Sequence, residues 1–143
     1  MSVPPPILLW IRRDFRLSDH PALSAAVVSG RPIIPVFVRD SGVVALGAAP
    51  KWRLGLGLKK FIETLSGRGS ALVLRSGDAL TSLEALVKET GATAVYWTRL
   101  YDSAAIARDQ AVKQSLRAQG IEARSFGGHL MFEPWDVETK TGG

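Results

Sequence analysis

The stretch ILLWIRRDFRLSDHPAL, residues 7–23, holds the first predicted strand, a charged loop and the start of a helix. Its apolar run, Ile7–Ile11, is short and continuous, which is typical of a strand buried on both faces of a parallel sheet. Ser18 and Asp19 are good N-cap residues and precede a helical segment, residues 21–29. The stretch therefore predicts the opening of a βαβ unit.

Short apolar runs and helical patterns alternate along the rest of the chain. Further strands are predicted at residues 32–38, 71–75, 94–98 and, more weakly, 121–126. Further helices are predicted at residues 51–66, 79–89 and 103–119. The order β-α-β-α-β-α-β-α-β predicts an α/β fold, namely a doubly wound five-stranded parallel sheet of the Rossmann-like or flavodoxin-like kind, built as an α/β/α sandwich.

The pattern of the last helix predicts its cap and its buried face. Asp102 or Ser103 is expected to cap it, because short polar side chains accept hydrogen bonds from the free N–H groups of a first turn. The buried face is expected to contain Ile106, Val112 and Leu116. Left-handed stops after helices are expected at Gly30, Gly91 and Gly120.

A ligand crevice is expected beyond the carboxyl ends of the strands, beside the first strand, where the strand order reverses. The loops at that point are residues 12–19, 39–50 and 99–102. Neither of the common glycine-rich phosphate loops occurs, and GLGL, residues 55–58, lies inside a predicted helix. No histidine, serine motif or second carboxylate is spaced for catalysis. The chain is therefore predicted to bind a ligand, with no catalytic residue of its own.

Composition limits the class of protein further. The 143 residues suit one domain, and the absence of cysteine excludes disulfides and thiolate zinc sites. His20 and His129 lie far apart in the chain, so no metal site is expected. No apolar run reaches the roughly 18 residues of a membrane span, and no signal peptide is visible, so a cytoplasmic protein without membrane contact is expected. The net charge of +5 permits a nucleic-acid partner without establishing one.

Residues 8–23, LLWIRRDFRLSDHPAL, closely resemble the opening signature of the DNA photolyase and cryptochrome family. In that signature an apolar strand precedes Arg-Arg-Asp-Leu-Arg-Leu-x-Asp-Asn and a helix. Phe15 here replaces the usual leucine, and His20 replaces the usual asparagine. Four later segments resemble the family in the same order: PVFVRD (35–40), ALVLRSGDAL (71–80), VYWTRLYDSAAIARD (95–109) and LMFEPWDVETKTGG (130–143).

The resemblance implies that residues 1–128 form the N-terminal α/β antenna domain of a deoxyribodipyrimidine photolyase. Residues 129–143 would begin the linker to a C-terminal FAD-binding domain that this chain lacks. In the family, the antenna passes light energy to FAD, and excited reduced FAD gives an electron to a pyrimidine dimer in DNA and splits it. This chain alone is not expected to repair DNA. The alternatives are the same domain of a cryptochrome blue-light photoreceptor, or a stand-alone nucleotide- or flavin-binding module.

Family members carry a deazaflavin, a folate, a flavin or no antenna, and the sequence leaves these alternatives open. An Asn-Glu pair found in some folate-binding members falls on Ala104 and Ala105, which weakens that reading. Similarity to deazaflavin-binding members, and the position of one tryptophan, imply cofactor contacts from Phe37, Asp40, Lys51, Trp52 and Asp102. Core packing, helix capping and a solvated surface position are the structural alternatives for these residues.

The charged residues of the first loop are open to two interpretations. Without the family resemblance, the residue types alone predict a structural ion pair in which Asp14 binds an arginine. The resemblance implies a structural role at the crevice and at the interface with the second domain for Arg12, Arg13, Asp14 and Arg16. An exposed apolar patch at that interface is expected to include Leu130, Met131, Phe132 and Trp135.

Overall fold

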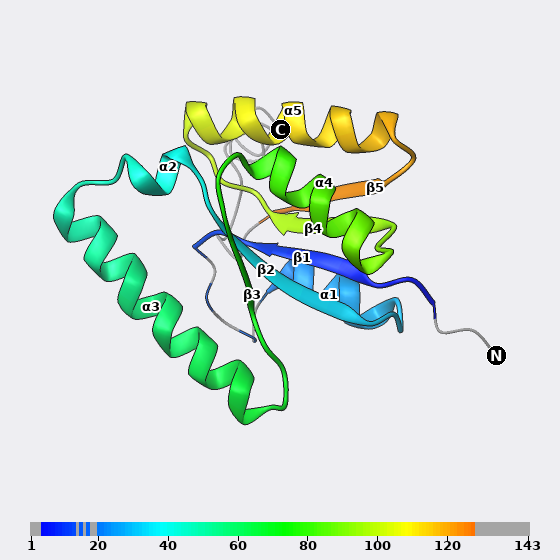
Figure 1. The fold of residues 1–143 in the computed structure, drawn as a ribbon, viewed down its shortest axis with the longest axis horizontal. Helices are drawn as coiled ribbons and strands as arrows, with labels where there is room; N and C mark the ends of the chain where they lie inside the picture. The colour runs from blue at the N-terminus through cyan, green and yellow to red at the C-terminus, as the bar shows by residue number, and fades with distance from the viewer. Residues whose placement is uncertain (1–3, 14, 16, 18–19, 128–143) are drawn as a thin grey trace, which may run out of the picture.

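Five parallel strands form the centre of the molecule (Figure 1). The computed structural model describes residues 4–13, 15, 17 and 20–127. The strands are β1 (Ile7–Ile11), β2 (Ile33–Arg39), β3 (Val73–Ser76), β4 (Ala94–Thr98) and β5 (Glu122–Phe126). They pair in the order β3-β2-β1-β4-β5, with every pair parallel. The predicted doubly wound five-stranded sheet is confirmed, and β1 and β4 begin and end at the predicted residues.

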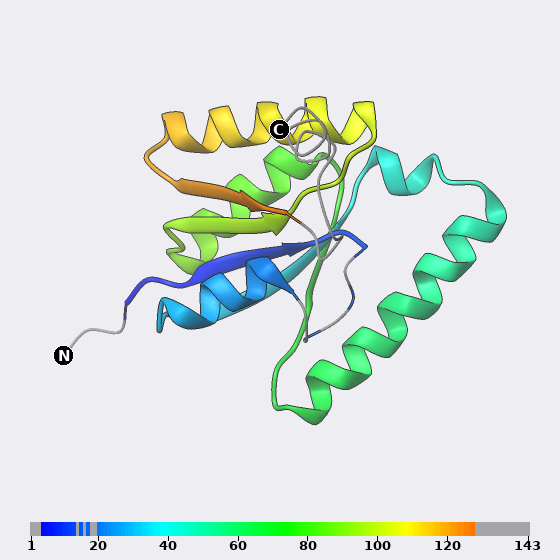
Figure 2. The same cartoon turned by 180° about the vertical axis from the view of Figure 1, so that it is seen from behind.

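Helices cover both faces of this sheet (Figure 2). They are α1 (Pro21–Val28), α2 (Ser41–Val44), α3 (Ala48–Gly67), α4 (Ala79–Thr90) and α5 (Ser103–Ala118). On one face, Trp10 of β1 belongs to a core cluster shared with Leu83 of α4 and with α5. On the other face, Leu9 belongs to a cluster shared with α1 and with Phe61 of α3. Since successive β1 side chains alternate between the faces, both layers depend on the first strand.

Helix α1 begins one residue after its cap, and that cap is His20 rather than Ser18 or Asp19. The His20 backbone is extended, with φ −123° and ψ 96°, and its Nδ1 accepts a hydrogen bond from the Leu23 N–H at 3.1 Å. Pro21 is the reason, because proline favours the first helical position and disfavours a helical residue before it. The helix therefore starts at the proline, and the residue next to it becomes the cap.

Helix α5 is capped by Asp102, one of the two predicted residues, whose carboxylate accepts from the Ala105 N–H at 2.9 Å. The prediction for its buried face is wrong at Ile106, which is 40% exposed. The buried residues of α5 are Ala105, Asp109, Val112 and Leu116. These positions follow the helical period, so Ile106 falls about a quarter turn outside the stripe.

The segment between β2 and α3 differs from the prediction. The one-turn helix α2 was expected to be loop, because four residues are too few to show a periodic pattern. Helix α3 begins at Ala48, before the predicted start at Lys51, and contains GLGL as expected. Left-handed backbone after helices is confirmed at Gly30, Gly91 and Gly120, with φ of 73°, 75° and 82°.

Gly55 and Gly57 of α3 form a matched pair for mutation. A Cβ at Gly57 would lie 3.0 Å from Cδ2 of Phe15, whereas a Cβ at Gly55 would meet nothing within 4 Å. Alanine in a helix is favoured over glycine by roughly 0.5–1 kcal/mol. Gly55→Ala is therefore expected to raise the free energy of unfolding by about that amount, and Gly57→Ala to raise it less or to lower it. Urea denaturation measures both, and equal gains would contradict the Phe15 contact.

Candidate ligand-binding cleft

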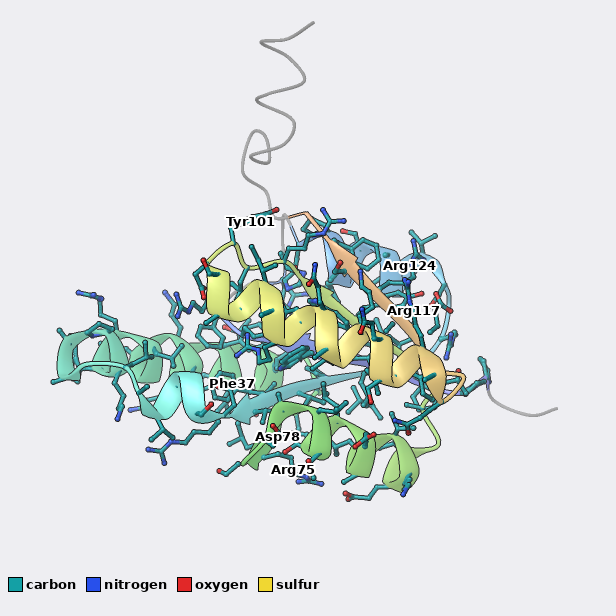
Figure 3. All side chains as sticks on the ribbon, turned by 90° about the horizontal axis from the view of Figure 1, so that it is seen from above. Phe37, Arg75, Asp78, Tyr101, Arg117 and Arg124 are labelled. Carbon is teal, nitrogen blue, oxygen red and sulfur yellow. The ribbon has the colours of Figure 1, made fainter. Side chains whose placement is uncertain are left out.

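A cavity of about 920 Å³ opens at the carboxyl ends of the strands. The strand order reverses between β1 and β4, so the cavity lies at the topological switch point, where the sequence predicts the crevice. Its lining comes from the three predicted loops and also from the turn between β3 and α4, which contains Asp78. Figure 3 shows Phe37, at the end of β2, and Asp78 on one side of α5, and Tyr101 and Arg124 on the other.

Three carboxylates on the cavity wall each cap a helix. Asp40 accepts from the Val43 N–H of α2 at 3.1 Å, and Asp78 accepts from the Thr81 N–H of α4 at 3.0 Å. Asp102 does the same for α5. The capping alternative is therefore confirmed for Asp40 and Asp102, and both also line the cavity. Their negative charges are held where helix dipoles stabilise them, at the edge of the space a ligand would fill.

A chain of charged side chains connects the cavity wall with Asp109 of α5. Arg108 of α5 donates to Asp40 Oδ2 from Nη1 at 2.8 Å, and its Nε lies 3.4 Å from Asp109 Oδ1. Nη1 of Arg12 lies 2.9 and 3.0 Å from the two oxygens of Asp109, and its Nη2 donates to the Thr98 carbonyl. Arg12 is only 7% exposed, so this pairing compensates a buried charge.

The ring of Trp10 supports the same two arginines. The guanidinium carbon of Arg12 lies 4.4 Å from the ring centroid, and that of Arg108 lies 5.5 Å from it. These distances are within the range of cation–π attraction. Arg12 thus ties the end of β1 to β4 and α5, as a structural role requires. Its described carboxylate partner is Asp109, while Asp14 and Arg16 lie outside the described residues. Arg13 is exposed and lines the cavity.

The structure brings some of the predicted contact residues together and separates others. Phe37 is 4% exposed, lines the cavity and has a ring centroid 5.9 Å from that of Phe15. Lys51 and Trp52 are not part of the cavity lining. Lys51 Nζ instead donates to the Val44 carbonyl at 3.1 Å, and Trp52 is 67% exposed. A cofactor contact from any of these residues stays a prediction.

Sequence reasoning missed three residues that shape the cleft. Asp78 was considered only as part of a segment that resembles the family, although β3 lies next to β2 and its following turn must reach the same edge of the sheet. Arg108 and Asp109 were read only as part of a family motif. One signal could have identified Asp109: a charged residue falls on the small and apolar stripe of α5, at the spacing of its buried positions.

A second cavity, of about 230 Å³, lies on the other side of β4, near α5 and β5. It is lined by Trp97 and by the cations Arg99 and Lys113, and Lys113 Nζ lies 2.9 Å from Ser125 Oγ. Burial lowers the pKa of Lys113, and repulsion by Arg117 and Arg99 lowers it further. The carboxylate of Asp109, which also lines this cavity, acts on the pKa of Lys113 in the opposite direction.

Neither a metal cluster nor a membrane span is found in the part of the chain that the structure describes. No three histidine, cysteine, aspartate or glutamate side chains of those residues are arranged to hold a metal ion. None of the described helices is both long and apolar enough to cross a membrane. The expected patch at Leu130, Met131, Phe132 and Trp135 lies outside the described residues.

The fold and the cleft together define a domain of the doubly wound α/β class with a cavity at its switch point. Within that class, the chain belongs to the DNA photolyase family, because the family model described as DNA photolyase matches residues 7–143. The family predicted from the opening signature is thereby confirmed.

Individual relatives agree with this assignment. A deoxyribodipyrimidine photo-lyase of Agrobacterium fabrum is 46% identical over 138 residues, which cover 96% of this chain and 29% of that protein. Cryptochrome-1 of Arabidopsis thaliana is 40% identical over 139 residues, covering 94% of this chain and 20% of that protein. The crystal structure of a class III photolyase from Agrobacterium tumefaciens superposes with a TM-score of 0.88 at 43% identity, covering all of this chain and 30% of that one. The chain thus spans less than a third of these relatives.

Proposed function

We propose that this chain is the light-harvesting domain of a deoxyribodipyrimidine photo-lyase, with an antenna chromophore bound in the cleft at the switch point. Residues 1–128 would form this domain, and residues 129–143 would begin the linker to a helical domain that binds FAD. The whole protein would use light to split pyrimidine dimers in DNA. The observation that carries the proposal is the cavity of about 920 Å³, in a chain of this family, at the place where its fold binds ligands.

The residues present fit a planar heterocyclic chromophore. Small-molecule sites usually have 300–1,000 Å³ of space, mostly apolar walls and a few fixed polar groups. Phe37, Leu46 and Leu54 supply apolar wall, and Asp40 and Asp102 supply acceptors whose positions are set by their capping bonds. When bound, the chromophore would supply absorption of near-UV or blue light and transfer of the excitation. A deazaflavin, a folate and a flavin all satisfy these features.

Four side chains at or near the cleft would each contribute to chromophore binding in a different way. Arg108 keeps the Asp40 carboxylate in one orientation through its 2.8 Å ion pair, so this acceptor needs little reorganisation on binding. Phe37 offers a rigid ring, because it is buried in strand β2 and lies against the ring of Phe15. Contacts from Lys51 and Trp52 would need a ligand that extends beyond the cavity towards the start of α3.

A cryptochrome photoreceptor is the second candidate, since Cryptochrome-1 of Arabidopsis thaliana is nearly as similar to this chain. The higher identity of the Agrobacterium fabrum photo-lyase favours repair. Reading the coding sequence past the codon for Gly143 tests the domain proposal. A helical FAD-binding region there would support it, and an immediate stop codon would favour a stand-alone binding module instead.

Binding of an antenna can be tested on the chain with a matched pair of variants. Ala104 lines the cavity at the exposed start of α5, whereas Ala111 is exposed on the same helix and lines neither of the two cavities described above. Deazaflavin, riboflavin and methenyltetrahydrofolate are titrated, and fluorescence anisotropy is measured. Ala104→Trp is expected to weaken binding by about tenfold or more by filling the cavity, and Ala111→Trp to leave it unchanged. Failure of all three chromophores to bind would contradict the antenna proposal.

A further inference from the structure

Helix α3 extends away from the rest of the domain at its N-terminal end (Figures 1 and 2). All of its residues are described, and none from residue 48 to residue 60 is buried. Phe61 and Leu65, in its second half, are the buried residues that attach it to the core. The first half therefore contacts the domain on one side only, through residues such as Gly57 and Leu54, and leaves its other side exposed, although apolar side chains occupy several positions there.

The outward face of this first half is apolar with a basic border. Trp52 is 67% exposed and Leu56 is 49% exposed, and they lie one turn apart on the same side of α3. Lys59 and Lys60 continue the same side in the next turn and are exposed. Tryptophan is among the residues most enriched at the centres of protein interfaces. We call Trp52, Gly55 and Leu56 the α3 face.

The open space around Gly55 is a second, independent observation that favours the approach of another surface to the α3 face. Glycine weakens a helix interior, and of the two glycines only Gly57 has a packing reason among the described residues, since its missing side chain admits the Phe15 ring. At Gly55 nothing lies within 4 Å of the place a Cβ would take. Gly55 is three residues after Trp52 and next to Leu56, so the open space belongs to the α3 face. A glycine there suits the close approach of a surface from outside the described residues.

The α3 face also adjoins the cleft. Val44 of α2 lines the cavity, is 54% exposed, and accepts a hydrogen bond from Nζ of Lys51, the residue before Trp52. A surface that covered Trp52 would therefore also reach the rim of the proposed chromophore site. This continuity connects the exposed apolar side chains to the function of the cleft.

We infer that the α3 face is the docking surface for the second domain of the photolyase. This inference rests on the proposed function, and specifically on a protein built like its relatives, of which this chain spans 29–30%. The remaining part of such a protein is more than large enough to cover one helix. The docked surface would be apolar at its centre, to receive Trp52 and Leu56, with carboxylates at its border facing Lys59 and Lys60.

Cysteine labelling tests the inference directly, because the chain has no cysteine of its own. Leu56→Cys reports on the α3 face, and Val28→Cys is the control, since Val28 is 87% exposed on α1. Maleimide labelling of each site is followed by peptide mass spectrometry in the chain and in a chimaera. The chimaera places this chain at the corresponding position of the Agrobacterium fabrum photo-lyase. Labelling at residue 56 is expected to be about tenfold slower or more in the chimaera, with residue 28 unchanged.

Equal labelling of residue 56 in the two proteins would overturn the inference. Protection that grows with the concentration of the chain alone would identify a second copy as the occupant instead. Protection that appears only when duplex DNA is added would identify a nucleic-acid surface. Chromophore binding by the chain is measured separately. Equal labelling of residue 56 would contradict the docking surface alone, whereas the absence of chromophore binding would contradict the antenna site alone.

Gly55→Leu gives a second measurement that needs no labelling. In the chain alone, the side chain would enter open space, so the melting temperature is expected to stay the same or rise. In the chimaera, the same side chain would enter the docked interface, and the melting temperature is expected to fall. A rise in both proteins would contradict close approach at Gly55.

Discussion

Replacing Asp109 with alanine is expected to lower the free energy of unfolding by about 3–5 kcal/mol. The Arg12 side chain is 6% exposed, and its Nη1 lies 2.9 Å from Asp109 Oδ1. Without the carboxylate, the guanidinium would stay buried and lose this ion pair, which the uncharged Thr98 carbonyl and Trp10 ring do not replace. Urea denaturation followed by far-ultraviolet circular dichroism measures the loss.

The exposed ion pair between Arg75 and Glu89 is the matched control. Its nitrogen–oxygen distance of 3.0 Å is close to that of the buried pair, but its side chains are 39% and 54% exposed. Exposed pairs contribute up to about 1 kcal/mol, so Glu89→Ala is expected to have a small effect. A loss for Asp109→Ala no larger than that for Glu89→Ala would show that water reaches Arg12. The double change Arg12→Met with Asp109→Leu removes both charges and is expected to restore much of the loss.

The fold was predictable because its signals are local. The apolar runs of β1 and β4 are fully buried and mark those strands to the residue. The edge strand β3 is only half buried and starts two residues later than its apolar run does. Helix α2 was not predicted because its single turn is too short to show a helical pattern of apolar residues. Where a strong local rule competed with another, as Pro21 did with the polar residues before it, the helix began at the predicted residue but its cap was His20 rather than Ser18 or Asp19.

The position of the cleft was predictable from the sequence, whereas the pairing of the charged side chains on its wall was not. The order of strands and helices is enough to put the ligand site beyond β1, β2 and β4. The partners that shape its wall are remote in sequence, since Arg12 and Asp109 are 97 residues apart, and Asp40 and Arg108 are 68 residues apart. Helix and strand periodicity relate residues only within one element, so they do not predict contacts between residues so far apart in the sequence. Only the folded sheet shows that the arginine of the first loop binds Asp109 of α5.

Replacing Trp10 with alanine is expected to cost about 3–5 kcal/mol of unfolding free energy. Trp10 is 0% exposed, lies in the central strand and meets Trp97 edge-to-face with ring centroids 5.4 Å apart. Alanine would leave a large cavity between β1 and helices α4 and α5. Chemical denaturation measures the loss, and Trp52→Ala is the control. Since Trp52 is 67% exposed, its replacement in the isolated chain is expected to change stability by no more than about 0.5 kcal/mol.

If Trp10→Ala is too unstable to purify, Trp10→Leu removes the aromatic ring with a smaller loss of volume and permits a double-mutant cycle. Combined with Trp97→Leu, it is expected to show a coupling of about 0.5–1.5 kcal/mol, the usual range for an aromatic pair. Combined with Asp109→Ala, it is also expected to be non-additive, because Trp10 and Asp109 both act on the Arg12 guanidinium. Additivity in both cycles would mean that Trp10 only fills volume. Coupling in both would mean that one buried unit joins the core to the wall of the cleft, so that a change in either partner alters the ligand site.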